Sequence, residues 1–384
     1  MNCIYSWIFF GAGAKDTSIR RAVPERLARI EKVIIVGKPV SIFRDRKVPS
    51  LRARCHRLQG EERCWEYRPL HYPERILGIG RVLKSLNRRQ IQHELSQLLL
   101  PNAKRIVCYD SPMQDHLVGK LGEDLSIYLA IDDLTLTVTG ESIEGELGAE
   151  QHLLSKVNLV ICVSDVLAKR LRERSPSLEK PAIHVLPNGY DERIFGSNGN
   201  YTEPNALRMI PRPRILVAGH ISDRIDWDGI ISAPQLRTPW TWIFLGPADN
   251  GMKERIASRL GQHGFYHPLI PLQDVPGWIY HFDACAVPYR VNPFTRASSP
   301  LKAIESLAMG APVLSTRIPS LQRYDRAIEW VNEGDGESYA RALDTFADPS
   351  RNKELVPFRR QAVAEDSWGV RVKQFREIVF NAIS

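Results

Sequence analysis

The sequence lacks several features that would assign it to a class at once. No apolar run reaches the roughly 18 residues that a membrane-spanning helix needs, so no segment is predicted to cross a bilayer as a helix. The six cysteines are scattered without close pairs, which is typical of reduced, buried thiols in a reducing compartment. There is no low-complexity tract and no nucleic-acid-binding motif. We therefore expect a cytoplasmic globular protein.

The first glycine-rich turn also lacks the dinucleotide-binding fingerprint. Gly11 and Gly13 follow an apolar run, but Asp16 stands where the fingerprint requires a third glycine. This disfavours a nicotinamide dehydrogenase. A glycine turn after a strand still lets the backbone approach a ligand, so Gly11 and Gly13 are candidate ligand-binding residues.

The most suggestive group of metal-ligating side chains does not have the spacing of a metal site. Cys55, His56, Cys64 and His71 match no common zinc pattern. We therefore predict no metal ion and no cofactor.

Positive charge is present and is unevenly distributed. The chain of 384 residues has a formal charge of +8, yet residues 1–105 hold 22 Lys and Arg against 9 Asp and Glu, so the remainder is net acidic. This favours an anionic partner for the first lobe, although a solvated basic face is the alternative. The amphipathic segment 74–100 either packs on its own domain or lies on an anionic membrane as a peripheral contact. No nucleic-acid partner is predicted.

Buried strands alternate with helices in two successive halves. This pattern, together with the chain length, predicts an α/β protein with two doubly wound domains. We expect a first domain over residues 1–190, a Gly-, Asn- and Pro-containing linker over 191–210, and a second domain over 211–366. Predicted strands include residues 3–10, 33–36, 106–109, 126–131, 158–163 and 183–186, then 214–218, 241–245, 284–287 and 313–316.

The segment Ser298–Ser315 reads as a helix with marked ends followed by a buried strand. We predict that Ser299 is the N-cap and that Gly310 ends the helix. Lys302 in the first turn has the wrong sign for the helix dipole, and an anion bound at the helix start would remove that conflict. Glu305 is placed to accept hydrogen bonds from vicinal hydroxyls. The alternative is a surface helix in which Lys302 and Glu305 simply pair.

Acidic residues follow two buried strands. Asp110 follows one strand, and Asp132 with Asp133 follows the next. Ligands of open parallel sheets bind outside the carboxyl ends of the strands, so these side chains are candidate general bases. Capping of the next helix is an equally good explanation for each.

Several motifs in order resemble the GT-B glycosyltransferases, which have two Rossmann-like domains facing a cleft. The resemblance is to the family-four-like branch that includes exopolysaccharide and teichuronic-acid enzymes, and it covers roughly residues 105–384. The motifs are NLVICVSDVLAKRL at 158–171, HVLPNGYD at 184–191, residues 214–228, WIFLG at 242–246, FDACAVP at 282–288 and SSPLKAIESLAMGAPVLST at 298–316. The terminal helix, residues 367–384, resembles the crossover helix that returns to the first domain.

The resemblance implies a nucleotide-sugar donor on the second domain and an acceptor on the first, where Gly11 and Gly13 are expected to bind it. By position, Glu305 would bind the ribose hydroxyls of the donor, and backbone around Leu269, Ile270 and Pro271 would contact its base. The diphosphate would be held near the start of the helix and after the first strand of that domain. The residues expected there are Ser298, Ser299, Lys302, Gly219, His220 and Arg224.

Two departures from the family pattern bear on the mechanism. No Glu is present near residue 297 or 298, where the first acidic residue of the E-x7-E motif would fall, and Asp226 stands where a Lys is usual. Both departures fit better the branch that resembles xanthan glucuronosyltransferase, for which an aspartate base and inversion are expected. Asp132 is the preferred base, with Asp133 and Asp110 as further candidates.

The function implied is that of a hexosyltransferase in polysaccharide or glycoconjugate biosynthesis. It would move a sugar from a nucleoside diphosphate sugar, expected to be UDP-linked, to a hydroxyl of a glycan or glycolipid. A sugar-nucleotide epimerase and a non-catalytic nucleotide-sugar-binding subunit are the alternatives.

Overall fold

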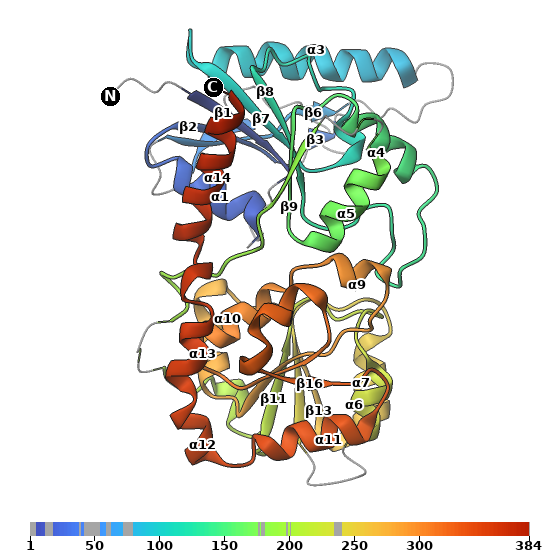
Figure 1. Ribbon diagram of the computed structural model, residues 1–384, viewed down its shortest axis with the longest axis vertical. Coiled ribbons are helices and arrows are strands. Elements are labelled where there is room, and N and C mark those ends of the chain that lie inside the picture. The colour runs from blue at the N-terminus through green and yellow to red at the C-terminus, as the bar shows by residue number, and fades with distance from the viewer. Residues whose placement is uncertain are drawn as a thin grey trace. The chain divides into compact units, whose positions relative to one another are not determined.

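The chain divides into two compact units, seen in a computed structural model (Figure 1). Unit 1 comprises residues 1–135, 143–187 and 371–384, and unit 2 comprises residues 136–142 and 188–370. The expected linker, 191–210, groups with unit 2, and so does the short segment 136–142. The structure describes residues 5–11, 18–37, 40–41, 54–58, 63–71, 80–175, 177, 181–196, 199, 201–233 and 240–383.

Unit 1 is built on an eight-stranded sheet that is parallel except at one edge. Its order is β10 (Ala182–Val185), β9 (Leu159–Cys162), β8 (Leu125–Ala130), β7 (Lys104–Tyr109), β1 (Tyr5–Phe10), β2 (Lys32–Val36), β5 (Cys64–Tyr67) and β4 (Cys55–Arg57), with β4 antiparallel to β5. A two-stranded sheet pairs β3 (Val40–Ser41) with β6 (Leu70–His71). The described helices of this unit include α1 (Ile19–Leu27), α3 (Gly80–Leu98), α4 (Glu146–Leu154) and α5 (Asp165–Arg174).

The C-terminal helix packs on the first strand of unit 1. In α14 (Trp368–Ile383), the ring of Phe375 lies 5.9 Å from that of Trp7 and 6.3 Å from that of Phe9. Both strand residues are fully buried. Apolar burial therefore joins the chain's last helix to its first described strand.

Unit 2 contains a six-stranded parallel sheet. Its order is β13 (Gly264–His267), β12 (Thr241–Leu245), β11 (Arg214–Ala218), β14 (Ala284–Val287), β15 (Val313–Thr316) and β16 (Ile328–Val331). The α-helices are α6 (Trp227–Ser232), α7 (Met252–Leu260), α8 (Val275–Tyr280), α9 (Pro293–Ala297), α10 (Leu301–Met309), α11 (Gly336–Thr345), α12 (Pro349–Glu354) and α13 (Val356–Ala362).

The two faces of the unit 2 sheet carry separate apolar cores. Ile215 and Val217 of β11 pack with residues of α6, α7 and α11, whereas Leu216 packs with residues of α8 and α10. Successive strand residues point to opposite faces, so helices on both faces require apolar residues in both registers. This explains the continuous apolar runs in the sequence.

The strands predicted in the second half are confirmed in their bounds at β11, β12, β14 and β15. The two edge strands, β13 and β16, were not predicted. All four residues of β13 and the middle two of β16 are only partly buried, so neither shows the apolar run of a central strand.

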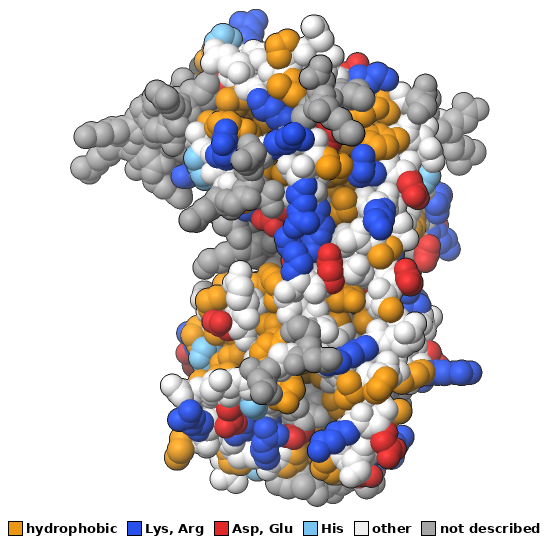
Figure 2. Space-filling model, turned by 90° about the vertical axis from the view of Figure 1, so that its left-hand side faces the viewer, with side chains coloured by type: hydrophobic (Ala, Val, Ile, Leu, Met, Phe, Trp, Pro, Cys, Tyr) orange, Lys and Arg blue, Asp and Glu red, His pale blue; other side chains and the backbone are white. Residues whose placement is uncertain are grey.

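Charged side chains are spread over the surface. On the face drawn in Figure 2, Lys and Arg side chains lie among apolar and acidic ones on both units. Within the described residues, no helix is both long and apolar enough to span a membrane. The five described cysteines are buried and unbridged.

Candidate functional site

The carboxyl edge of the unit 2 sheet has its topological switch point between β11 and β14, because the chain proceeds to one side from β11 and to the other from β14. The loops after these strands are joined by backbone hydrogen bonds from Asp226 N to Pro288 O and from Arg290 N to Arg224 O, both 2.7 Å. The guanidinium of Arg224 lies 4.7 Å from the centre of the Tyr289 ring. This cation–π contact holds Arg224 at the switch point.

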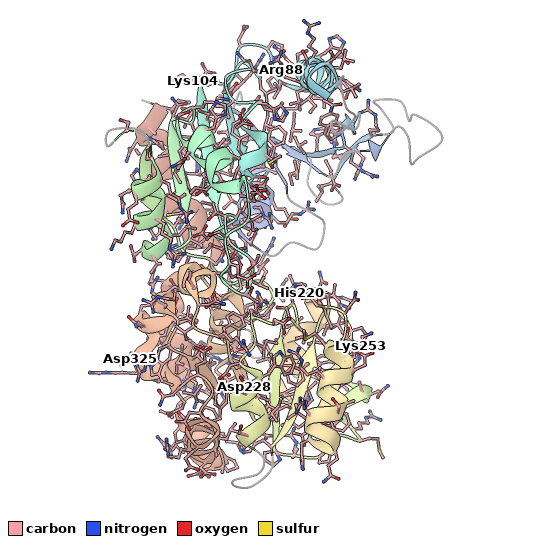
Figure 3. The ribbon with its side chains drawn as sticks, turned by 90° about the vertical axis from the view of Figure 1, so that its right-hand side faces the viewer. Arg88, Lys104, His220, Asp228, Lys253 and Asp325 are labelled. Carbon is pink, nitrogen blue, oxygen red and sulfur yellow. The ribbon has the colours of Figure 1, made fainter. Side chains whose placement is uncertain are left out.

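A pair of glycines lets the backbone pass closely at this edge. Gly219 follows β11 with φ 129° and Gly246 follows β12 with φ 139°. A Cβ on Gly246 would lie 2.1 Å from the carbonyl oxygen of Gly219, so no other residue fits there. His220, the next residue along (Figure 3), is exposed, and its Nε2 lies 2.7 Å from Asp249 Oδ1.

The start of α10 differs from the prediction. The N-cap is Pro300, which has no side-chain capping bond, rather than Ser299. The Ser299 hydroxyl instead accepts a 3.3 Å hydrogen bond from Asn188 N, and Asn188 Nδ2 donates to Ser299 O at 2.9 Å. The assignment of Ser299 as the cap was wrong because a residue distant in sequence uses its hydroxyl. The end of the helix at Gly310, with φ 81°, is confirmed.

The first turn of α10 is electrostatically open. The backbone amides of residues 301–303 donate to no acceptor within the described part of the chain, and the turn contains no acidic residue. Unpartnered amides at a helix start, with the positive end of the helix dipole, form a site suited to an anion.

Lys302 and Glu305 form the pair that the sequence offered as the alternative to ligand binding. Lys302 Nζ donates to Glu305 Oε2 at 2.6 Å, with side chains that are 24% and 3% exposed. The ammonium therefore lies beside the open first turn and the carboxylate lies beneath the surface. Next to them, the Ser298 hydroxyl donates to Thr295 O at 2.7 Å, and the Ser298 carbonyl accepts from Ser320 Oγ at 2.7 Å.

The loop after β13 lies at the same edge of the sheet. Leu269 is 51% exposed and Ile270 is partly buried against the core beside α10. Pro271 precedes a 3₁₀ turn, Leu272–Asp274. The backbone of this loop is thus exposed next to the edge strand β13, at the carboxyl ends of the strands.

Unit 1 has its own switch point, between β1 and β7. An ion pair occupies the carboxyl ends of the strands there. Asp110, 5% exposed, accepts hydrogen bonds at 2.9 Å from Arg20 Nη1 and from Gln114 Nε2. A Cβ on Gly11, with φ 89°, would lie 1.7 Å from Asp110 Oδ2. Asp110 does not cap the next turn, because Ser111 does. Gly13 lies outside the described residues.

Asp133 is enclosed by positive charge. Its fully buried carboxylate accepts hydrogen bonds from Arg170 and Arg174 of α5, at 2.8 and 2.9 Å, and from Thr135 Oγ1 at 2.6 Å. Burial alone would raise the pKa of Asp133, but the hydrogen bonds from Arg174 and Thr135 outweigh it and hold the pKa below its ordinary value. Asp132, the residue before it, is only partly buried. Asp133 is therefore held in buried ion pairs that stabilise the fold, whereas Asp132 lies nearer the surface.

Residues that position this site were missed at the sequence level. In the sequence, Asn188 stands out only as one position of the motif at 184–191, and Tyr289 is not singled out at all. Asn292 caps α9 and also donates from Nδ2 to Val138 O at 2.9 Å, which ties the segment 136–142 to the loop that leads into α9. These contacts join positions more than 60 residues apart in the sequence, so no local pattern marks them. Among the described residues, no group of three or more His, Cys, Asp or Glu side chains is placed to hold a metal ion.

Comparison with known sequences finds a family match within the second half of the chain. Residues 212–348, which contain the open helix start and both joined loops, match the family described as glycosyl transferases group 1. The chain is 24% identical over 230 residues to a putative teichuronic acid biosynthesis glycosyltransferase, TuaH, of Bacillus subtilis. That match covers 59% of this chain and spans 57% of the relative's length.

Solved structures share the fold over nearly the whole chain. Sucrose-phosphate synthase from Thermosynechococcus elongatus superposes with a TM-score of 0.72 at 16% identity, covering 98% of each chain. HepE of Anabaena, solved in complex with UDP-glucose, gives a TM-score of 0.69 at 12% identity, covering 98% of this chain and 99% of that one. The chain has the GT-B fold of two parallel-sheet α/β domains, and its residues 212–348 match the family of group 1 glycosyl transferases.

Proposed function

We propose that this protein transfers a hexose from a nucleoside diphosphate sugar, expected to be UDP-linked, to a hydroxyl of a glycan or lipid-linked acceptor. The single observation that carries the proposal is the open first turn of α10 beside Lys302, within the segment that matches the glycosyltransferase family. Unit 2 would bind the donor and unit 1 the acceptor. The relative named for teichuronic acid biosynthesis supports a role in polysaccharide or glycoconjugate synthesis.

The leaving group explains why such a helix start is useful. A departing nucleoside diphosphate develops negative charge on its β-phosphate, and fixed donors that face this charge stabilise the transition state. The amides of residues 301–303 and the Lys302 ammonium are donors of this kind, with Ser298 and Ser299 beside them. Arg224 and the backbone at Gly219 and His220 would contact the same phosphates. We propose that these groups make a metal ion and any cofactor unnecessary.

Glu305 would hold the donor through its ribose. Its carboxylate is 3% exposed and bonds to Lys302, and we infer that vicinal hydroxyls approach its second oxygen. The pairing observed without ligand is compatible with this role, because the ammonium rotates toward a phosphate while the carboxylate stays in place. The backbone of Leu269 to Pro271 would contact the base.

Asp132 is the proposed general base. The acceptor hydroxyl must lose a proton as it attacks, and a carboxylate within reach can accept it as a general base. Asp133 and Asp110 are each held by arginine, and protonation of either would break an ion pair. A carboxylate base that acts directly on the acceptor favours inversion at the anomeric carbon.

Calorimetry with UDP tests donor binding. Lys302→Met should weaken UDP affinity by about tenfold or more, because a charge-assisted hydrogen bond is lost. Lys353→Met, which removes the same charge from exposed α12, is the matched control and should bind as the wild type does. Equal affinities in wild type and Lys302→Met would refute the proposed phosphate site.

A transfer assay separates the enzyme from its alternatives. Asp132→Asn should bind UDP normally and lose about 10²–10⁴ in turnover, the usual worth of a positioned base. Conversion of the donor sugar without any acceptor would indicate an epimerase instead. Donor binding with no turnover against a broad acceptor panel would indicate a non-catalytic subunit. Screening a nucleotide-sugar panel by saturation-transfer NMR identifies the donor to use.

We also propose a peripheral contact of unit 1 with an anionic membrane on its cytoplasmic side. Helix α3 exposes Val82 by 59% and Leu86 by 43%, and these two residues line a shallow pocket with Ser85 and Arg89. Arg88 lies on the same helix (Figure 3). Liposomes with acidic lipid should pellet the wild type at low salt and release Leu86→Ser, whereas equal pelleting by neutral liposomes would contradict the electrostatic part of the proposal.

A further inference from the structure

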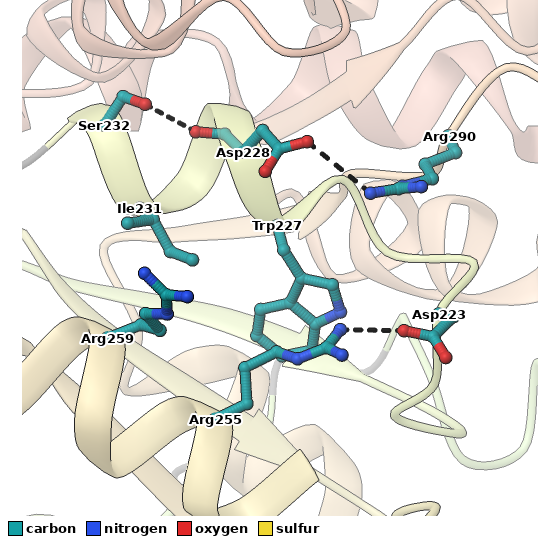
Figure 4. Close-up of a pocket in the computed structure, with 8 residues that line it drawn as sticks. All are labelled: Asp223, Trp227, Asp228, Ile231, Ser232, Arg255, Arg259 and Arg290. Atoms are coloured by element: carbon teal, nitrogen blue, oxygen red, sulfur yellow. Dashed lines mark hydrogen bonds and ion pairs between the residues drawn. The ribbon is translucent and has the colours of Figure 1, made fainter. Parts of the chain in front are cut away.

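A cavity of about 380 Å³ lies in unit 2 between α6 and α7, and none of its described lining residues belongs to α10 (Figure 4). This volume falls within the roughly 300–1,000 Å³ typical of small-ligand sites. Its lining comes from two helices and from the loops after β11 and β14. The described residues that line it are Asp223, Trp227, Asp228, Ile231, Ser232, Arg255, Arg259 and Arg290.

Three arginines line the cavity and differ in how firmly they are held. Arg255 Nη1 pairs with Asp223 at 2.7 Å, and its guanidinium lies 5.6 Å from the Trp227 ring. Arg290 pairs only loosely with Asp228, at 3.5 Å, and that carboxylate is 76% exposed. Arg259 has no ion pair or hydrogen bond within the described part of the chain, and no dashed line reaches it in Figure 4. The lining therefore has one positive charge in excess.

The other polar groups of the lining are already occupied. The indole N–H of Trp227 donates to Ser222 O at 3.3 Å, and the Ser232 hydroxyl donates to Asp228 O at 2.6 Å. The donors left for a ligand are those of the guanidinium groups, whose planar forks match the oxygens of a phosphate. We propose that this cavity binds a phosphate group carried by a small molecule, at a site separate from that of the donor diphosphate.

The cavity and the proposed donor site are formed by the same loops, but they use different residues of those loops. Asp223 precedes Arg224 and Arg290 follows Tyr289, and Arg224 and Tyr289 are the pair held by a cation–π contact. The hydrogen bond from Arg290 N to Arg224 O, 2.7 Å long, connects the two loops directly. A phosphate bound by Arg290 would therefore restrain the loop that carries Arg224.

The test is calorimetric titration of the full chain with inorganic phosphate. It is carried out in the Lys302→Met background, so that phosphate binds more weakly at the start of α10 and the result does not depend on the donor proposal. Arg259→Gln should weaken phosphate binding by about tenfold, because a charged donor is lost. Lys253→Gln makes the same charge change on the same helix, outside the lining (Figure 3), and should bind phosphate unchanged.

A second variant, which is expected to bind phosphate more tightly, tests whether a loss of binding could be due to misfolding. Asp228→Asn frees Arg290 from its only partner in the lining, so phosphate should bind about threefold more tightly. Loss of binding in Arg259→Gln with a gain in Asp228→Asn would support the site. Unchanged binding in Arg259→Gln, equal loss in Lys253→Gln, or weaker binding in Asp228→Asn would each overturn it.

Discussion

The two switch points of the molecule treat charge in opposite ways. In unit 1, the carboxylate of Asp110 at the end of β7 is neutralised by Arg20 and bonded to Gln114. In unit 2, the amides in the first turn of α10 have no acceptor among the described residues, and Lys302 pairs there with Glu305 alone. The same sheet architecture thus has one edge that is internally satisfied and one that is prepared for an external anion.

This difference separates positions that hold the fold from positions that await a ligand. Buried charge costs free energy unless it is paired, so a pair such as Arg20 with Asp110 is explained by folding alone. An open helix start gives no comparable stabilisation without a ligand. Paired charge should therefore matter for stability, and open donors for binding.

The largest expected effect is on stability, at Asp133. Asp133→Ala should lower the free energy of unfolding by about 3–5 kcal/mol, because the buried carboxylate that bonds to both Arg170 and Arg174 is removed. Urea unfolding monitored by circular dichroism measures the loss. Asp165→Ala, an exposed acid in the first turn of the same helix, should cost only about 0.5 kcal/mol.

The same residue predicts a pH dependence. Because the folded-state pKa of Asp133 lies below its ordinary value of 3.8, its stabilisation is present above pH 3.8 and is lost as the pH falls through the folded-state pKa. The difference in unfolding free energy between wild type and Asp133→Asn should therefore shrink in acid. A difference that grows as the pH falls would contradict the pairing.

The next effect concerns the glycine pair of unit 2. Gly246→Ala should destabilise the protein by about 2–3 kcal/mol, since its φ of 139° is unfavourable for Ala and its Cβ would press on the Gly219 carbonyl. Gly251→Ala is the control: φ is 79°, but nothing lies within 4 Å of the added Cβ. It should cost about 1 kcal/mol in the same thermal unfolding assay. Equal losses would mean that close approach of the two loops is unimportant.

The smallest effect tests whether the unit 1 edge is structural. Asp110→Asn should lower the free energy of unfolding by about 1–2 kcal/mol, because the hydrogen bond from Arg20 loses its charged acceptor. UDP affinity should not change. If turnover were abolished while stability stayed the same, Asp110 rather than Asp132 would be the base, and the contrast between the two edges would fail.

The sequence predicted the central strands better than the edge strands or the contacts between distant residues. Strands β11, β12, β14 and β15 were found because burial on both faces leaves continuous apolar runs, and the edge strands β13 and β16 were not, because they are partly exposed. The α/β class follows directly from such runs and the helices between them. Residues 191–210 were expected to form a linker because they are poor in apolar residues, yet Phe195 and Leu207 are buried in the unit 2 core.

The site was predictable only as far as local patterns reach. The helix of α10, its end at Gly310 and the nearness of Lys302 to Glu305 all follow from spacing along the chain. The role of Ser299 does not follow from local spacing, because its hydroxyl accepts a hydrogen bond from Asn188, 111 positions away in the sequence. The environment of Asp133 was equally hidden, since its arginines lie on α5, 37 and 41 positions further on.

The central claim is that the first turn of α10 receives the donor phosphates, and backbone amide NMR during a UDP titration tests it most directly. The account predicts that the largest amide shifts occur at Leu301, Lys302 and Ala303, the three donors left without acceptors in the described chain. Saturable UDP binding that leaves these three amides unmoved while others shift would contradict it.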